Sequence, residues 1–368
     1  MSRVLDTFLD LVRISSPPGR EREVAQYVAE ALRQSGCDAR FDDTQSATGA
    51  DTGNLLALME GTAPGLSVGL SAHMDCVQPC EGVEPVVADG VIRPSGETVL
   101  GADDKAGIAA IIEAVRRVHE SGRPHGAVRI LLTVSEEIGL VGAKALAADD
   151  CAVDLCLVLD ADGPVGGIVT AAPTHYTFKA VFTGRAAHAG VEPERGLSAI
   201  AMATAAIGRM PLGRLDEATT ANIGTIHGGS ATNVVPPTCE VTGECRSRDA
   251  ERVEIIRAEM DATMRTAAAE SGGAVDIAWQ LEYRGFQLDE GSPALELVER
   301  ACEEVGIAPR RFGTGGGSDG NIISAHGIPT VVLAAGMSKV HSTAEELEIA
   351  ELERLADLLE VILRRAVA

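Results

Sequence analysis

The sequence is poor in aromatic residues and in positive charge. Aromatic side chains make up only 3% of its 368 residues, so small aliphatic side chains must fill most of the core. The 31 lysines and arginines are outnumbered by 54 aspartates and glutamates, which gives a formal net charge of −23. Such a charge repels phosphate, and we therefore expect neither nucleic acid nor an anionic membrane as a partner.

Long apolar runs and patterned cysteines are also missing. No segment approaches the roughly 20 apolar residues of a membrane helix. The first segment, MSRVLDTFLDLVR, carries Asp6 and Asp10 within its apolar stretch, unlike a signal peptide. The eight cysteines are scattered and form no paired CxxC motif, so we expect neither a disulfide framework nor a zinc knuckle. Together these features predict a cytoplasmic protein.

Helical and strand-like segments alternate along the chain. Apolar residues recur at helical spacing in 4–12, 24–32 and 108–118. Strand-like runs lie at 55–58, 68–71, 128–134 and 155–159. This alternation predicts an α/β fold, with a mostly parallel mixed sheet and helices on both of its faces.

The pattern changes between residues 172 and 285. There the order strand, helix, strand, strand, helix, strand predicts an α+β domain with a four-stranded antiparallel sheet and two helices. At 368 residues, two domains are expected. Because candidate site residues occur on both sides of this segment, we expect an inserted domain, with residues 1–171 and 286–368 forming a discontinuous main domain.

Five residues with oxygen or nitrogen donors lie where strand-like runs end or a helix opens. They are His73, Asp103, Glu137, Asp160 and His341. A lone His or Asp at such a place is more often structural, for example a helix cap. Strand ends of an open α/β sheet are also where reacting groups gather. Five such residues with no Cys among them match the ligands of zinc, cobalt or manganese.

Two acidic residues next to these candidates have a possible chemistry of their own. Asp75 lies two positions after His73, on the same side of an extended chain, and can orient the imidazole. Glu136 precedes Glu137, so one carboxylate of the pair can bind metal while the other accepts a proton. Hydrolysis by a two-metal centre is therefore the first hypothesis.

The motifs SAHMD, LGADDKAG, TVSEEIG, LDADG, AAHAG, GGGSDGN and VHSTAEE resemble those of the co-catalytic zinc exopeptidase family. This family contains tripeptidase T, carboxypeptidase G, aminoacylase and succinyl-diaminopimelate desuccinylase, and the resemblance covers nearly the whole chain. It implies that His73, Asp103 and Asp160 bind one zinc, and that Asp103, Glu137 and His341 bind the second. It also implies a cis peptide bond between Asp103 and Asp104.

The resemblance implies further roles. Glu136 would be the general base and Asp75 the partner of His73, while residues 172–285 would form a lid. Apart from the resemblance, exposed edge strands in this segment could pair the lids of two chains in a homodimer or stay free. His188 of that lid would stabilise the oxyanion, although it could also be a surface-loop histidine. Substrate-binding positions would be Asn233, Arg246, Gly316 and Ser318. Arg246 could instead face solvent, and the glycine loop, residues 315–321, could be a plain turn.

The implied activity is hydrolysis of short peptides, as in a tripeptidase or aminopeptidase. Asp at position 160 favours this branch, since Glu accompanies carboxypeptidase G. The segment between His73 and Asp103 is shorter than in tripeptidase T, so substrate preference stays open. The alternatives are an amidohydrolase that deacylates N-acyl amino acids and a non-catalytic metal-binding or small-molecule-binding protein.

Overall fold

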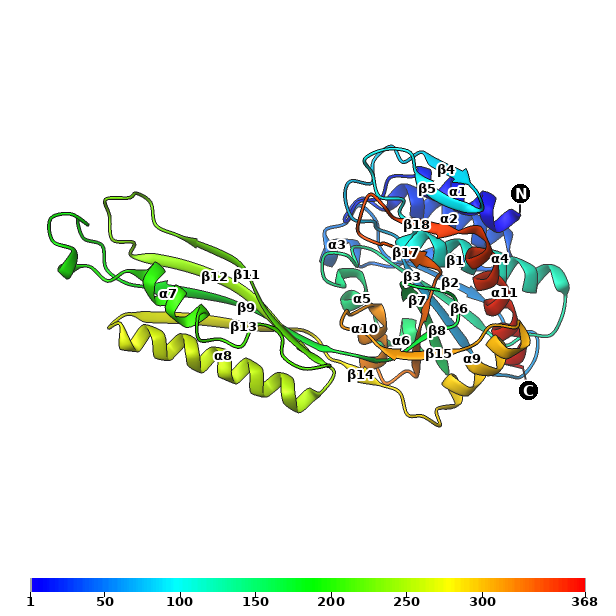
Figure 1. Ribbon diagram of the computed structural model, residues 1–368. Helices are drawn as coiled ribbons and strands as arrows, with labels where there is room; N and C mark the ends of the chain where they lie inside the picture. Colours follow the sequence, from blue (N-terminus) through cyan, green and yellow to red (C-terminus); the bar gives the residue numbers. More distant parts are fainter. Residues whose placement is uncertain (1, 368) are drawn as a thin grey trace. The chain divides into compact units, whose positions relative to one another are not determined.

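The computed structural model describes residues 2–367, which fall into two compact units (Figure 1). Unit 1 contains the chain up to Thr170, the segment Leu288–Phe312, and the chain from Ser318 on. Unit 2 contains Ala171–Gln287 and Gly313–Gly317. The sequence placed residues 313–317 in the main domain, whereas they group with unit 2.

Nine strands form the main sheet, in the spatial order β1-β2-β6-β3-β7-β16-β8-β14, with β15 paired to β8. They are β1 (Asp38–Phe41), β2 (Leu55–Met59), β3 (Val68–His73), β6 (Val128–Thr133), β7 (Leu155–Ala161), β8 (Gly167–Ala172), β14 (Phe286–Gln287), β15 (Arg310–Gly313) and β16 (Thr330–Ala334). The central strands β6, β3, β7 and β16 are parallel, and their outer neighbours β2 and β8 pair antiparallel. The expected mixed sheet is confirmed, with its parallel pairing in the four central strands.

Helices cover both faces of this sheet. The helices of unit 1 are α1 (Arg3–Arg13), α2 (Arg22–Gln34), α3 (Gln45–Thr48), α4 (Ala102–Ser121), α5 (Val141–Ala145), α6 (Ala148–Cys151), α9 (Pro293–Glu304), α10 (Asp319–Ala325) and α11 (Ile349–Arg365). Val331 and Leu333 of β16 share one buried cluster with α4 and α11. Val332 between them meets Gly320 of α10 instead. Because side chains of a strand alternate between faces, α10 covers the face opposite α4.

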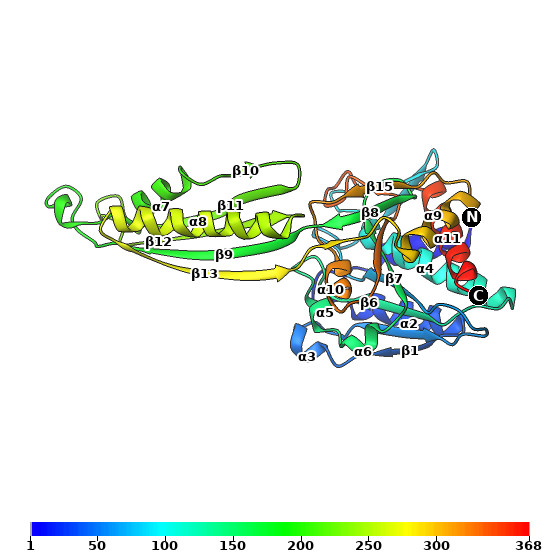
Figure 2. The ribbon, with the colours of Figure 1, turned by 90° about the horizontal axis from the view of Figure 1, so that it is seen from below.

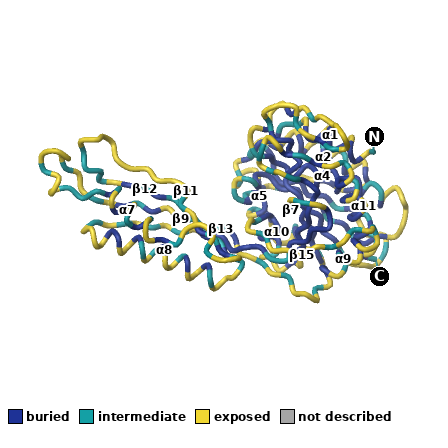
Figure 3. The backbone as a smooth tube through the Cα atoms, viewed as in Figure 1, coloured by how far each residue is buried: buried dark blue, intermediate teal, exposed yellow. Residues whose placement is uncertain are grey.

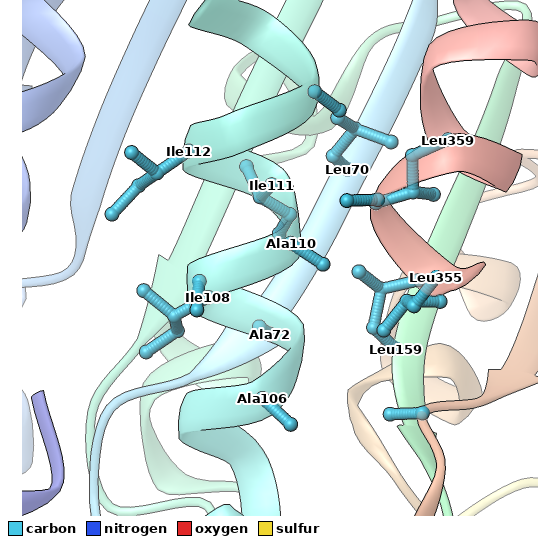
Figure 4. Close-up of a cluster of buried hydrophobic side chains, with 14 of the residues drawn as sticks. Leu70, Ala72, Ala106, Ile108, Ala110, Ile111, Ile112, Leu159, Leu355 and Leu359 are labelled. Carbon is cyan, nitrogen blue, oxygen red and sulfur yellow. The ribbon is translucent and has the colours of Figure 1, made fainter. Parts of the chain in front are cut away.

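The core of unit 1 is made of small aliphatic side chains, as the low aromatic content predicted. Figure 4 shows Ala106, Ala110 and Ile111 of α4 on the side of that helix nearest Leu70 of β3 and Leu355 of α11. All five are fully buried. Alanines at the contact let α4 lie close to the sheet, and Figure 3 shows the central strands buried along their length.

A second, small sheet in unit 1 has the strand order β17-β18-β5-β4. Its strands are β17 (Met337–Ser338), β18 (Glu346–Glu348), β5 (Val91–Pro94) and β4 (Pro85–Ala88). The hairpin of β4 and β5 comes from the segment between His73 and Asp103. The pairing of β18 with β5 therefore joins this segment to the chain that follows His341.

Unit 2 is an antiparallel sheet with two helices along it (Figure 2). Its strand order is β10-β11-β12-β9-β13, and its elements are β9 (Thr174–Thr183), η1 (Pro193–Arg195), α7 (Ala199–Ile207), β10 (Gly213–Arg214), β11 (Thr219–Gly228), β12 (Thr238–Ser247), α8 (Ala250–Glu270) and β13 (Ala274–Tyr283). The four long strands and two α-helices agree with the prediction, and the two-residue β10 adds a fifth strand. None of the helices within residues 2–367 is both long and apolar enough to cross a membrane.

Replacing Leu70 by Ala tests the core of unit 1. Leu70 is fully buried between β3 and α4, so the cavity should lower the free energy of unfolding by about 2–5 kcal/mol. Leu66→Ala, at a side chain 42% exposed on the same segment, should change it by less than about 0.5 kcal/mol. Urea unfolding monitored by circular dichroism measures both, and equal effects would contradict this packing.

Candidate metal centre

The parallel strands of the main sheet bring the predicted site residues to one edge. His73 is the last residue of β3, Asp160 is the last but one of β7, and Glu136 and Glu137 follow the end of β6. Since β3 lies between β6 and β7 and is parallel to both, the carboxyl ends of these three strands lie together. The long sequence separation of these residues thus becomes a short distance in space.

Asp103 lies between the two histidines. Its Oδ1 is 3.0 Å from Nε2 of His73, and its Oδ2 is 3.3 Å from Nε2 of His341. It precedes the straight part of α4 and is joined to Asp104 by a cis peptide bond, which confirms that expectation. One carboxylate oxygen for each imidazole is the arrangement that a bridging ligand needs.

Glu137 and Asp160 complete the group on either side of Asp103. Oε1 of Glu137 lies 3.0 Å from Nε2 of His341, and Oδ1 of Asp160 lies 3.8 Å from Nε2 of His73. Donor atoms of His73, Asp103 and Glu137 all lie within 4.8 Å of one another, a spacing at which they could share an ion. His341 is the least buried member, with 53% of its side chain exposed.

The same 4.8 Å spacing also groups His73 and Asp160 with Asp104, for which no role was predicted. The carboxylate of Asp104 is fully buried and accepts backbone N–H groups of His73 and Gly107, at 3.3 and 3.2 Å. These bonds tie the start of α4 to the end of β3. Asp104 therefore stabilises the position of its neighbour Asp103.

The charges at this edge favour a cation. Burial, with added repulsion from Asp103, raises the pKa values of Asp104 and Asp160 well above the usual range of a carboxyl. Hydrogen bonds to Asp103 and Glu137 raise the pKa of His341 to about 10. Crowded buried carboxylates beside imidazoles are the donor set that divalent metals bind, so these residues fit a metal centre.

Asp75 has a wider role than the sequence suggested. Nδ1 of His73 lies 3.0 Å from the backbone oxygen of Asp75 and 3.4 Å from its Oδ1. The two carboxylate oxygens accept the N–H groups of Glu136 at 2.9 Å and Glu137 at 3.1 Å. Ser135, at a positive φ of 54°, turns the chain just before this pair. Asp75 thus links the His73 strand end to the two glutamates.

Glu136 lies beside the candidate ligands and is 8% exposed. Burial, together with the nearby charge of Asp160, raises the pKa of its carboxyl well above the usual range. A carboxylate whose pKa is raised takes up protons more readily near neutral pH, as a general base must. Its position and its acidity are therefore both suited to proton transfer.

Glu345 was not identified from the sequence, yet it holds the loop before Asp103. Its buried carboxylate accepts three backbone N–H groups, from Leu100 and Gly101 at 2.8 Å and from Asp103 at 3.0 Å. It lies four residues after His341, so one short segment supplies a candidate ligand and the support of another. The only sequence signal was its place inside the VHSTAEE motif.

Two further buried acids support the strand ends without having been predicted. Glu21, which precedes α2, accepts the N–H of Ser135 at 2.9 Å and its hydroxyl at 3.0 Å. Asp319, the first residue of α10, accepts the hydroxyl of Thr133, the last residue of β6. Burial raises the pKa of Asp319 to about 6. Glu21 looks like an ordinary helix-start acid, and the only sequence signal for Asp319 was its place inside the GGGSDGN motif.

The remaining predicted residues divide between the units. In unit 2, His188 and Asn233 are exposed and lie on adjoining loops, where the backbone N–H of Ala189 donates to the backbone oxygen of Asn233 at 2.9 Å. Arg246 is half-buried on β12 of the same unit. In the glycine loop, Gly316 N–H donates to Thr314 Oγ1 at 3.1 Å.

Ser318, in unit 1, is the N-cap of α10. Its Oγ accepts the N–H of Gly320 at 3.2 Å, and its own N–H donates to Oδ1 of Asn321 at 3.1 Å. This reciprocal pair is a capping box that fixes the first turn of the helix. The side chain therefore has a structural partner, whatever the loop binds.

Comparisons with known proteins give matches over most of the chain. A family model described as peptidase family M20/M25/M40 matches residues 69–365. An uncharacterised Bacillus subtilis protein, YqjE, is 41% identical over 99% of this chain and 98% of its own length. Aminopeptidase PepT from Bacillus cereus has a TM-score of 0.93 and 41% identity, covering 99% of this chain and 98% of that one. A tripeptidase from Staphylococcus aureus has a TM-score of 0.95 and 38% identity, covering 98% and 97%.

Replacing Glu345 by Gln should weaken metal binding although Glu345 is not a ligand itself. The neutral amide has one acceptor oxygen for three N–H groups, so the loop that carries Asp103 should loosen. We expect cation affinity to fall by about 10- to 100-fold, measured by titration of the metal-free protein with Zn²⁺. Glu348→Gln, at an exposed position three residues later, is the control and should bind as the unmodified chain does. Equal affinities for the two variants would contradict this role.

Proposed function

The chain belongs to peptidase family M20/M25/M40, and from this premise we propose that it is a two-metal exopeptidase acting on short peptides. It is a hydrolase of peptide bonds. The tripeptidase-like or aminopeptidase-like preference is supported by its similarity to the Bacillus cereus aminopeptidase and the Staphylococcus aureus tripeptidase. The observation that carries the proposal is the position of Asp103 between His73 and His341, with Glu136 close by.

The proposed ligand sets share Asp103. His73, Asp103 and Asp160 would hold one cation, and Asp103, Glu137 and His341 the other. Zinc is the proposed metal, with cobalt or manganese as alternatives, since all three accept imidazole and carboxylate ligands. When bound, two such cations polarise the scissile carbonyl and lower the pKa of water.

Glu136 is the proposed general base. It would take a proton from the attacking water and return it to the leaving amine. Asp75 would hold the Glu136 backbone in place through the bond to its N–H group. This division explains why two adjacent glutamates follow β6: one would bind metal while the other stays free to exchange protons.

Unit 2 is the proposed lid. His188 would stabilise the oxyanion that develops during attack, and its exposed loop leaves the imidazole accessible. Asn233, Arg246, Gly316 and Ser318 would bind the substrate, with the guanidinium of Arg246 meeting a free carboxylate. Dimerisation through this unit stays a prediction. The ten-residue strand β13 lies at the edge of the sheet and could pair with a second chain.

Replacing Glu136 by Gln tests the base. The amide keeps the shape of the side chain but cannot take up a proton, so kcat on a short peptide should fall by about 10²- to 10⁴-fold. Metal content, measured by mass spectrometry of the dialysed protein, should be unchanged. Glu23→Gln, at an exposed position of α2, should retain full activity. Near-normal turnover by Glu136→Gln would refute the assignment.

Metal removal tests the centre and the substrate class together. A chelator should abolish turnover and lower the melting temperature, because ions that bind only the folded chain stabilise it, by about 2.7 kcal/mol per site at a hundredfold excess over Kd. Zn²⁺, Co²⁺ or Mn²⁺ is then restored, and the protein is assayed on tripeptides, dipeptides and N-acyl amino acids. Cleavage of N-acyl amino acids alone would establish the amidohydrolase alternative. No turnover of any amide with both ions bound would favour a binding protein.

A further inference from the structure

Four polar side chains form a connected cluster on the sheet of unit 2. In register across β12, β9 and β13, Arg246 lies opposite His175, and His175 lies opposite Tyr283. Glu244 precedes Arg246 by two residues and so faces the same side of β12. We call His175, Glu244, Arg246 and Tyr283 the Arg246 cluster. Its residues face away from α7 and α8, because the alternate residues Tyr176 and Cys245 pack with those helices.

Glu244 is the centre of the cluster. Its Oε1 accepts Nε–H of Arg246 at 3.1 Å, and its Oε2 accepts Nη2–H of Arg246 at 2.9 Å. Nε2 of His175 lies 2.9 Å from the same Oε2. Since a carboxylate can only accept, this contact makes Nε2 the protonated nitrogen of His175. The hydrogen bond from His175, with a further one from Arg246, lowers the pKa of Glu244 to about 2, so it stays ionised.

Glu244 occupies only one of the two edges on which the guanidinium of Arg246 can bind a carboxylate. Glu244 occupies the Nε and Nη2 edge, while Nη1 lies 3.4 Å from the hydroxyl oxygen of Tyr283. The edge between Nη1 and Nη2 is the second edge on which a guanidinium can bind a carboxylate with two parallel hydrogen bonds. A free Arg side chain would lose rotamer entropy when it bound a ligand, whereas this one is already fixed.

The glycine loop contacts the same cluster. A Cβ atom at Gly317 would lie 2.3 Å from the ring of Tyr283, so only glycine leaves room for this tyrosine. Tyr283 also stacks at a tilt against His175, with ring centres 5.2 Å apart. Loop, tyrosine, histidine and glutamate therefore form one packed support around the guanidinium.

We propose that Glu244, itself held by His175, is a positioning residue that fixes Arg246 so that its Nη1 and Nη2 edge meets the terminal carboxylate of the substrate. This inference rests on the proposed function, in which Arg246 binds the substrate. Glu244 does not compete with the substrate for Arg246, because it takes the other edge and is anchored by a second partner. Removing its charge should therefore weaken binding of the carboxylate, whereas removing a competitor would strengthen it.

The test compares a tripeptide with its carboxyl-terminal amide, using the metal-loaded protein. Glu244→Gln should raise KM for the free acid about tenfold, the size expected for disturbing one charged hydrogen bond. Its kcat on the acid and its kcat/KM on the amide should change little. His175→Phe, which keeps an aromatic ring beside Tyr283 but lacks the donor, should shift KM in the same direction.

Glu240→Gln is the matched control. Glu240 lies on β12 like Glu244 and faces the same side of the sheet. It forms an ion pair with Lys179 at 2.8 Å and not with Arg246. This variant should leave both substrates unaffected. A lower KM for Glu244→Gln, an unchanged KM, or an equal loss on acid and amide would each overturn the positioning role.

Arg246→Gln separates this inference from the function on which it rests. If it leaves the ratio of acid to amide turnover unchanged, the substrate role of Arg246 fails. If it abolishes the preference while Glu244→Gln does not, only the positioning role fails. Should the unmodified chain cleave neither peptide, the side-chain N–H signal of Arg246 in an NMR spectrum gives the answer without turnover. Glu244→Gln should shift and broaden this signal and Glu240→Gln should not, and an unaltered signal in Glu244→Gln would overturn the inference.

Discussion

The structure depends on keeping several carboxylates buried together at the carboxyl edge of a parallel sheet. An unpaired buried charge is costly, so each acid needs donors or a cation. Backbone N–H groups supply part of the needed hydrogen-bond donors. Glu345 accepts three of them and Asp75 accepts two. The imidazoles of His73 and His341 supply another part, through Asp103. Divalent cations bound to the same oxygens would compensate the remaining negative charge. The proposed metal centre would therefore also stabilise the fold.

The supporting acids also explain how distant segments are fixed relative to one another. Glu21 holds Ser135, Asp75 holds the two glutamates after β6, and Glu345 holds the loop before Asp103. Each bond joins two segments that are far apart in the chain. Because the supports are short hydrogen bonds within the buried part of unit 1, they locate the candidate ligands more firmly than exposed loops could.

A carboxylate also holds a proposed functional side chain in place in unit 2. There Glu244 fixes the guanidinium of Arg246, and His175 fixes Glu244. In both units a carboxylate with two or more partners fixes the group that is proposed to do the chemistry or the binding. The unit-2 example stands on antiparallel strands, where register alone places Arg246, His175 and Tyr283 in one row.

The sequence by itself determined the α/β character and predicted the candidate ligands and the inserted segment, because hydrophobic periodicity and short motifs are local properties of the chain. The cis bond after Asp103, which the family resemblance implied, is also confirmed. Apart from Asp75, the supporting acids were not assigned a role in this way. Glu21 and Glu244 look like ordinary helix or strand acids. Asp319 and Glu345 lie inside recognised motifs, but no motif names the partner of either carboxylate, because the partners lie far away in the chain. Only the tertiary structure decided which buried N–H, hydroxyl or guanidinium each carboxylate meets, since those pairings arise from strand order and packing rather than from sequence spacing.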